Sequence, residues 1–224
     1  MRTIVFSPLG SLRYGTSIRA NYLIDGLIKN GYKTSCYEMG IASKHTFMDS
    51  VRIRSAASIP LLPSRFNKAE MVFFEGIPFV PNKKRTNIMV NYLKKAKTQK
   101  KKIVLDLYDD PTFQRRDLLG YNLNAGDWEP VRNAFIESAD AVLFPSKSMM
   151  DYYVKIGVAT AKRCHVVMNA SDPSHFREAP APGNCVIGLL TGFGAGRGLE
   201  MLIDAFASVE GEIGDAELRV GCSA

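Results

Sequence analysis

Short apolar runs rich in valine, isoleucine and phenylalanine alternate along the chain with longer stretches whose apolar residues recur at helical spacing. This alternation constrains the fold strongly, because consecutive parallel strands need a crossover connection, which is usually a helix. We therefore predict the α/β class, with a doubly wound, Rossmann-like parallel sheet. Such sheets bind ligands at the carboxyl ends of their strands, so the loops after the strands should carry the site.

The alternation is complete in residues 1–168, which we predict to be one Rossmann-like domain. Residues 40–65 are an exception, because charged residues and two prolines there break the apolar period and indicate a loop-rich connection. Elsewhere, β-branched runs indicate strands and apolar residues three and four positions apart indicate helices. The predicted strands are 3–6, 32–37, 71–74, 103–107, 141–144 and 165–168, and the predicted helices are 18–30, 87–97, 129–139 and 147–156.

A stretch containing proline and glycine interrupts the alternation, and we predict that residues 169–184 form a linker. The alternation then restarts, with strands at 185–190 and 217–220 around a helix at 199–209. A single unit of this kind, in residues 185–224, is too small to bury a core by itself. Either it packs on the first sheet, or the chain is a fragment whose second domain is incomplete.

The composition is that of a soluble globular protein, with 46% hydrophobic and 23% charged residues. No apolar run approaches the roughly 18 residues that span a bilayer, and the apolar start is too short for a secretory signal. The expected location is therefore the cytoplasm. The four cysteines and three histidines are scattered without metal-binding or disulfide spacing, so we expect no metal.

The net charge is +7, and the excess of basic residues is concentrated at 83–85 and 94–102. Three interpretations stay open: a solvated helix face followed by a loop, a contact with an anionic membrane surface, or a contact with nucleic acid. No DNA- or RNA-reading module accompanies the charge, so we expect no nucleic-acid partner. The membrane interpretation adds a peripheral location at the inner face of the membrane and uses Lys94, Lys95, Lys100, Lys101 and Lys102.

Two strand-to-helix loops carry glycine where a phosphate can approach the backbone. One contains Gly192, Gly196 and Arg197, and the other ends in Gly15 and Thr16. Backbone N–H groups at a helix N-terminus attract phosphate, and an arginine adds a forked contact to a diphosphate. The alternative is a plain capped turn at each position, since neither loop is a clean dinucleotide fingerprint or a P-loop.

Acidic residues follow two of the predicted strands. Asp106, Asp109 and Asp110 lie at or just past the end of one strand, and Glu75 follows another. Acids at such positions can accept hydrogen bonds from sugar hydroxyls, bind a cation or act as a base. The alternative is a turn, which Asp-Asp-Pro favours. Ser146 has no visible histidine partner and is expected to cap a helix rather than to act as a nucleophile.

Four motifs occur in a specific order and spacing. The first helix carries Gly15, Leu23, Leu27 and Gly31, and residues 138–146 read Ser-Ala-Asp-Ala-Val-Leu-Phe-Pro-Ser. Residues 165–176 hold Asn169, Asp172 and Phe176, and residues 186–206 include Arg197-Gly198-Leu199. Together these motifs resemble those of GT-B glycosyltransferases of group 1, the family 4-like type, over essentially the whole chain.

The chain departs from the pattern of that family at three places. Gly192-Phe193 stands where Gly-Arg is common, and Tyr108 and Asp109 stand where many members carry a histidine. The family's pair of glutamates with seven residues between them does not occur after residue 185. The resemblance therefore implies a chain that is truncated in its C-terminal, nucleotide-sugar-binding domain and is inactive alone.

The resemblance implies a retaining transferase that moves a sugar from a nucleotide-sugar donor to an acceptor hydroxyl, in glycan or glycolipid synthesis. The donor is a substrate, so no cofactor and no metal is expected. Residues 1–168 would be the acceptor-side domain. The resemblance assigns the donor phosphates to Gly15, Thr16, Gly192, Gly196 and Arg197, and it assigns the acceptor or the transferred sugar to Asp109 and Asp110 as catalytic residues.

Two other functions stay open. The chain can be a non-catalytic or split-enzyme subunit, acting as a membrane-docked acceptor-binding module whose second domain a partner chain completes. It can also be an unrelated nucleotide-binding enzyme such as a dehydrogenase. The first strand-to-helix loop argues against the dehydrogenase, because it lacks Gly-x-Gly-x-x-Gly.

Overall fold

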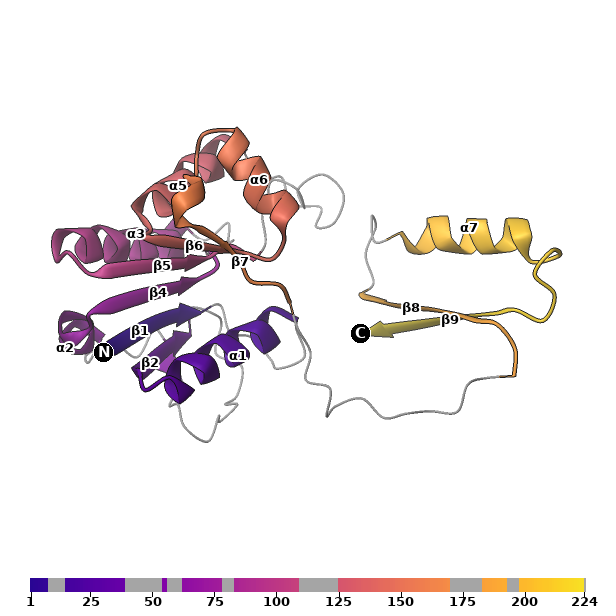
Figure 1. The fold of residues 1–224 in the computed structure, drawn as a ribbon, viewed down its shortest axis with the longest axis horizontal. Coiled ribbons are helices and arrows are strands. Elements are labelled where there is room, and N and C mark those ends of the chain that lie inside the picture. The colour runs from indigo at the N-terminus through magenta and orange to yellow at the C-terminus, as the bar shows by residue number, and fades with distance from the viewer. Residues whose placement is uncertain are drawn as a thin grey trace. The chain divides into compact units, whose positions relative to one another are not determined.

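The structure is a computed structural model that describes residues 1–7, 15–38, 54–55, 62–77, 83–108, 125–169, 183–192 and 198–223. The described residues fall into two compact units, the first up to residue 169 and the second from residue 183 (Figure 1). Both units contain parallel strands with a helix between them in sequence.

The described strands of the first unit form a seven-stranded sheet in the order β3-β2-β1-β4-β5-β6-β7, and each pair in it is parallel. The predicted α/β class with a doubly wound parallel sheet is therefore confirmed. The order reverses at β1, since β2 and β3 lie on one side of it and β4 on the other. Doubly wound sheets bind ligands at such a reversal. The strands are β1 Arg2–Ser7, β2 Lys33–Glu38, β3 Arg54–Ser55, β4 Met71–Glu75, β5 Lys102–Asp106, β6 Ala141–Phe144 and β7 Cys164–Val166.

Helices cover both faces of this sheet. Ala20 and Ile24 of α1 pack with Val5, Cys36 and Phe73 on one face. The other described α-helices of the unit contribute side chains to a larger core on the opposite face (Figure 1). The helices are α1 Gly15–Lys29, α2 Leu62–Lys68, α3 Lys83–Thr98, α5 Ala125–Ser138 and α6 Lys147–Lys155, and a 3-10 turn spans Ala161–Arg163.

Aromatic rings form the centre of the larger core. Phe6 and Phe74 stack with their ring centroids 5.4 Å apart, and Phe135 meets Phe74 edge-on at 5.1 Å. All three side chains are buried. Successive residues of a strand point to opposite faces, so Phe6 joins this core while Val5 joins the smaller one. The alternating side chains of β1 therefore contribute to the cores on both faces of the sheet.

Local signals define several helix ends as the sequence predicts. Ser146 caps α6, because its Oγ accepts a hydrogen bond from the Met149 backbone N–H at 3.2 Å. Gly31 and Gly157, which follow α1 and α6, have φ angles of 79° and 76°. Glycine adopts this left-handed conformation without strain, and residues with a Cβ seldom do.

The sequence predicts an apolar stripe along the first helix at Ile18, Tyr22, Leu23, Leu27 and Ile28, but Tyr22 does not face the sheet. Tyr22 is 41% exposed, whereas Ala20 and Ile24 are buried. Residues four apart in a helix lie on the same side, so Ala20 and Ile24 face the sheet together, and Tyr22, two positions from each, does not.

The second unit contains β8 Val186–Gly192, α7 Leu199–Val209 and β9 Glu217–Ser223. The two strands are parallel neighbours, with Val186 opposite Glu217 and Gly192 opposite Ser223. None of the described side chains of this unit is buried. The described residues therefore form the elements of a parallel α/β unit, and none of the side chains described there is part of a buried core.

Candidate functional site

Polar side chains gather where the strands around the reversal end. Ser7, Glu75 and Asp106 are the last residues of β1, β4 and β5, which are neighbours in the sheet. All three are buried, with exposed fractions of 0, 1 and 0%. Buried acids are rare unless they are paired or protonated. The carboxyl edge of the sheet therefore holds a specialised cluster rather than an ordinary part of the core.

Arg19 supplies the positive charge of this cluster from the first turns of α1. Its Nε donates to Asp106 Oδ2 at 2.8 Å and its Nη2 donates to Asp106 Oδ1 at 2.7 Å. This forked contact matches the planar guanidinium to both carboxylate oxygens, and the arginine is only 7% exposed. Burial raises the pKa of Asp106, and the hydrogen bonds and positive charge of Arg19 oppose that shift.

The same guanidinium also holds the segment by which the chain leaves the first unit. Nη1 of Arg19 donates to the Val167 backbone oxygen at 2.7 Å and to Asn169 Oδ1 at 3.1 Å. Val167 follows β7 directly, and Asn169 is the first residue of the predicted linker. One side chain thus connects α1, the end of β5 and the start of the linker, so the linker begins from a fixed point.

Glu75 is the second buried acid, and the Ser7 hydroxyl donates to its Oε2. The pKa of Glu75 is raised to about 8: burial is the largest cause and the negative charge of Asp106 adds to it, whereas the hydrogen bond from Ser7 and the charge of Arg19 oppose the shift. Glu75 is therefore protonated at neutral pH. Its Oε1 has no hydrogen-bond partner in the described part of the chain. A neutral carboxyl with one unused oxygen can donate or accept a hydrogen bond to a substrate group.

The backbone conformation and the close neighbours of position 76, directly after Glu75, favour glycine there. Gly76 has a φ of 71°, and a Cβ there would lie 2.8 Å from Cε1 of Tyr108. The Gly76 backbone N–H donates to the Asp106 carbonyl oxygen at 2.8 Å. A larger residue would therefore be strained and would displace the Tyr108 ring, which covers the backbone next to both acids.

Three of the predicted donor-binding residues lie within the described elements. Gly15 and Thr16 begin α1, and Gly192, which the sequence predicts in a strand-to-helix loop, is the last residue of β8. Gly196, Arg197, Asp109 and Asp110 lie outside the described residues. Glu75 and Asp106, which the pattern of acids after strands also indicated, are register partners at the ends of the neighbouring strands β4 and β5.

The sequence did not predict Arg19, Ser7 or the contact of Asn169 with Arg19. One signal was available for Arg19: it stands four residues before Leu23, on the core-facing side of α1. A charged residue in that position needs a buried partner. For Ser7 no such signal exists, because a serine after a strand reads equally well as a turn residue.

The cluster has the chemistry of a hydrogen-bonding site. Both oxygens of Asp106 are occupied by Arg19. Among the described residues, no group of three or more His, Cys, Asp or Glu side chains is arranged to hold a metal ion. Nor does any helix in the described part of the chain combine the length and apolar character needed to cross a membrane.

No family model matches the chain, and no curated protein matches it either. Among solved structures it resembles an alpha-glucosyltransferase in complex with UDP and a 13-mer DNA, with 14% identity and a TM-score of 0.58 over 99% of this chain and 67% of that one. It also resembles Anabaena HepE in complex with UDP, with 13% identity and a TM-score of 0.64 over 100% of this chain and 62% of that one.

A third similar structure is the lipopolysaccharide outer core galactosyltransferase WaaB in its apo form, with 13% identity and a TM-score of 0.59 over 100% of this chain and 62% of that one. The chain thus spans between 62 and 67% of the length of these three neighbours. Sequence identities this low show a shared fold and nothing further. The chain has the Rossmann-like α/β fold of the GT-B glycosyltransferases.

Proposed function

We propose that the chain belongs to a retaining GT-B glycosyltransferase of the family 4-like type, which moves a sugar from a nucleotide-sugar donor to an acceptor hydroxyl. The observation that carries this proposal is the fold likeness over nearly the whole chain to several glycosyltransferases, two of them in complex with UDP. Glycan or glycolipid synthesis is the proposed setting, and the likeness to a lipopolysaccharide galactosyltransferase favours it.

The start of α1 and the loop after β8 supply the proposed contacts to the donor diphosphate. Backbone N–H groups at helix starts would approach its oxygens. The proposed donor residues are Gly15, Thr16, Gly192, Gly196 and Arg197, and the proposed catalytic residues near the acceptor are Asp109 and Asp110. No cofactor and no metal takes part in this proposal. Catalysis would rest on positioning the sugar and stabilising the leaving diphosphate.

The buried cluster positions these groups rather than reacting itself. Arg19 connects the first turns of α1 to β5 and to the start of the linker, so it sets the direction in which the α1 N-terminus points. Glu75, protonated at neutral pH, offers a neutral hydrogen-bonding group at the same edge. Loss of Arg19 would therefore weaken donor binding without removing a group that touches the donor.

Isothermal titration of the chain with UDP and with GDP tests donor binding, and mass spectrometry of reactions with UDP-sugars and glycan acceptors tests transfer. We expect weak nucleotide binding and little or no transfer, because the glutamate pair of the family is missing. Arg19→Lys should weaken nucleotide binding more than Arg163→Lys, a matched change far from the carboxyl edge. Absence of any nucleotide binding, by this chain and by a form extended to the length of its neighbours, would contradict the proposal.

A second candidate is a split-enzyme subunit that a partner chain completes. The absence of buried side chains among the described residues of the second unit favours it, and Met201 on α7 is 73% exposed. Co-expression with separately encoded α/β domains that complete this unit tests the idea. A stable complex that gains transferase activity supports it, whereas a second unit that stays monomeric with every such domain argues against it.

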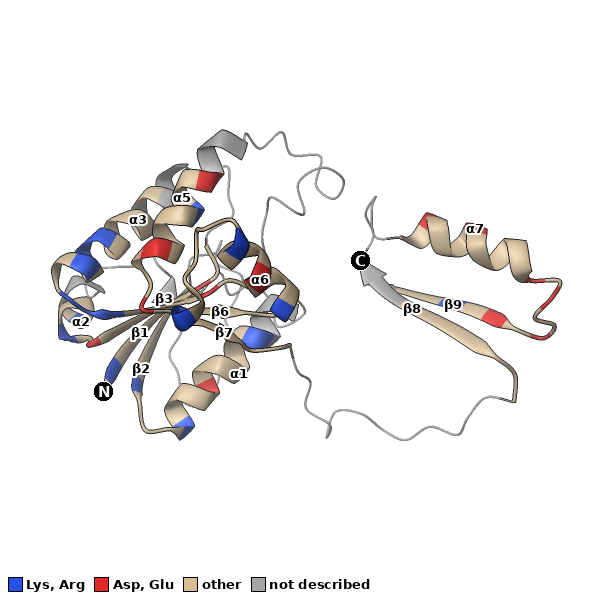
Figure 2. Cartoon of the chain, turned by 45° about the horizontal axis from the view of Figure 1, so that its top comes forward, with Lys and Arg blue, Asp and Glu red and all other residues tan. Residues whose placement is uncertain are grey.

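We also propose a cytoplasmic location, in which the chain makes peripheral contact with the anionic surface at the inner face of a membrane. The lysines that support this contact are Lys94, Lys95, Lys100, Lys101 and Lys102, near the end of α3 and the start of β5. Figure 2 draws lysines and arginines together in this region of the first unit. Salt-dependent binding to anionic vesicles tests it, since screening weakens such contacts.

A further inference from the structure

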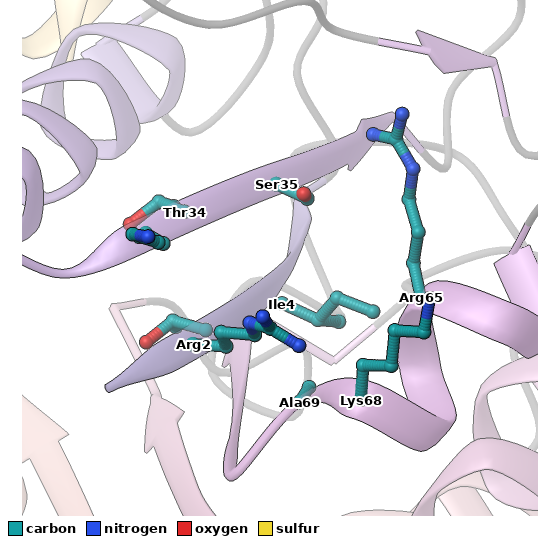
Figure 3. Close-up of a pocket in the computed structure, with 9 residues that line it drawn as sticks. Arg2, Ile4, Thr34, Ser35, Arg65, Lys68 and Ala69 are labelled. Carbon is teal, nitrogen blue, oxygen red and sulfur yellow. The ribbon is translucent and has the colours of Figure 1, made fainter.

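A separate cavity of about 350 Å³ lies at the amino ends of β1 and β2, against α2 (Figure 3). Glu75 and Asp106 end their strands, whereas the cavity is lined by the first residues of neighbouring parallel strands. The cavity is therefore at the opposite edge of the sheet from the cluster described above. Nothing in the proposed transferase chemistry uses it.

The charged residues that line this cavity are all basic. Arg2 comes from β1, Lys33 from β2, and Arg65 and Lys68 from α2. Figure 3 shows the two α2 side chains across from Arg2 on the strand. Within the described residues none of these four side chains forms an ion pair. The carboxylate of nearby Glu70 instead accepts a hydrogen bond from the Arg2 backbone N–H at 3.1 Å.

Two neighbouring lysines hold α2 in place without entering the lining. Lys95 and Lys101 lie over the Phe66 ring, with Nζ 5.4 and 5.2 Å from its centroid. Lys101 Nζ also donates to the backbone oxygens of Asn67, at 3.3 Å, and of Ala69. Burial and the charge of Lys95 lower the pKa of Lys101. These contacts fix α2 against the start of β5, so Arg65 and Lys68 are presented from an anchored helix.

The lining also contains a hydroxyl group. Ser35 of β2 is the register partner of Ile4, whose side chain packs in the core on the α2 side of the sheet. Because directly paired residues of parallel strands point to the same face, the Ser35 hydroxyl lies on the same side of the sheet as α2.

We propose that this cavity binds a phosphate monoester. Two guanidinium forks and two ammonium groups match a dianion with several oxygens, and the Ser35 hydroxyl adds a hydrogen bond. A volume of about 350 Å³ holds a phosphate together with a small polar group attached to it. Such a group is carried by a soluble sugar or glycerol phosphate and by the head group of phosphatidic acid. The site does not depend on the transferase proposal.

The test uses the full chain and two charge-matched double variants. Arg65→Gln with Lys68→Gln removes two lining cations, and Lys155→Gln with Lys162→Gln removes two exposed cations outside the lining and outside the lysines proposed for membrane contact. The probes are glycerol 3-phosphate, measured by isothermal titration, and phosphatidylcholine vesicles with or without phosphatidic acid, measured by co-sedimentation. We expect the lining variant to bind about tenfold more weakly and the control to change by less than about twofold.

The two probes separate the sources of the phosphate. Binding of glycerol 3-phosphate supports a soluble ligand, and binding of phosphatidic acid vesicles alone supports a lipid head group. An equal loss in both double variants overturns the proposal, because only overall charge would then matter, and so does binding of neither probe. Ser35→Ala adds a check that leaves charge unchanged, and it should weaken binding of the probe that the chain binds.

Discussion

The two units are built from the same parts, yet they differ in what those parts bury. The first unit has a seven-stranded sheet with side chains packed on both faces, including the fully buried Phe6, Phe66 and Phe74. The second has two strands and a helix, and none of its described side chains is buried. Strand-helix-strand alternation therefore creates secondary structure in both, but a core requires enough neighbouring strands for helices to cover.

Truncating one phenylalanine in each unit gives the largest expected contrast. Phe74→Ala removes a ring that is 0% exposed and that packs against Phe6 and Phe135, so it should cost about 4 kcal/mol of unfolding free energy. Phe206→Ala on α7 removes a half-exposed ring and should cost less than about 1 kcal/mol. Urea denaturation followed by circular dichroism measures both. Equal costs would show that the second unit has a core after all.

Breaking the buried ion pair between Arg19 and Asp106 should have the next largest effect on the unfolding free energy. The second unit contains a comparable pair on its surface, Arg219 and Glu217. Arg19→Met leaves the Asp106 carboxylate buried without its partner and should cost about 3 kcal/mol. Arg219→Met breaks the contact to Glu217, whose side chain is 46% exposed, and should leave the unfolding free energy nearly unchanged, because solvent screens an exposed pair.

The double variant Arg19→Met with Asp106→Leu sharpens this prediction. Because it removes both charges, it should recover much of the stability that Arg19→Met alone loses. Thermal unfolding of Arg19→Met, Asp106→Leu and the double variant gives a double-mutant cycle. Costs that simply add would mean that the two side chains do not act as a pair.

The sequence predicts the first unit far better than its site. Strand and helix positions depend on local periodicity, and Ser146 at the start of α6 and Gly31 after α1 depend on local chemistry. The contact between Arg19 and Asp106 joins residues 87 positions apart, and only the sheet order brings them together. The pattern of acids after strands identified one half of that pair, but it carries no information about which helix supplies the arginine.

Glu75 makes the stability of the first unit depend on pH. Its pKa is about 8 in the folded state and near 4.5 as the reference value, so between these values folded chains hold a proton that unfolded chains release. Stability should therefore fall as pH rises from 4.5 to 8, by at most about 1.4 kcal/mol per pH unit. Asp106, whose pKa burial also raises, adds to the same trend.

Glu75→Gln removes that proton exchange and keeps the shape of the side chain. The variant should show a flatter stability profile between pH 5 and 8, measured by urea unfolding at a series of pH values, with the difference from the original chain about 1 kcal/mol per pH unit. Parallel profiles in the two proteins would mean that Glu75 is ionised in the folded chain despite its burial.

Helix starts provide the smallest and most local comparison between the units. In α6 the Ser146 hydroxyl accepts from the Met149 N–H, whereas Gly198 before α7 makes no side-chain cap and has a φ of 78°. Ser146→Ala should cost about 1 kcal/mol, because it leaves that N–H without its partner. Gly198→Ser should not stabilise α7 in return, since a Cβ at a left-handed φ is strained and offsets any new cap. If thermal unfolding showed a gain for Gly198→Ser, the start of α7 would be free to change its backbone, as expected of a unit that no core holds in place.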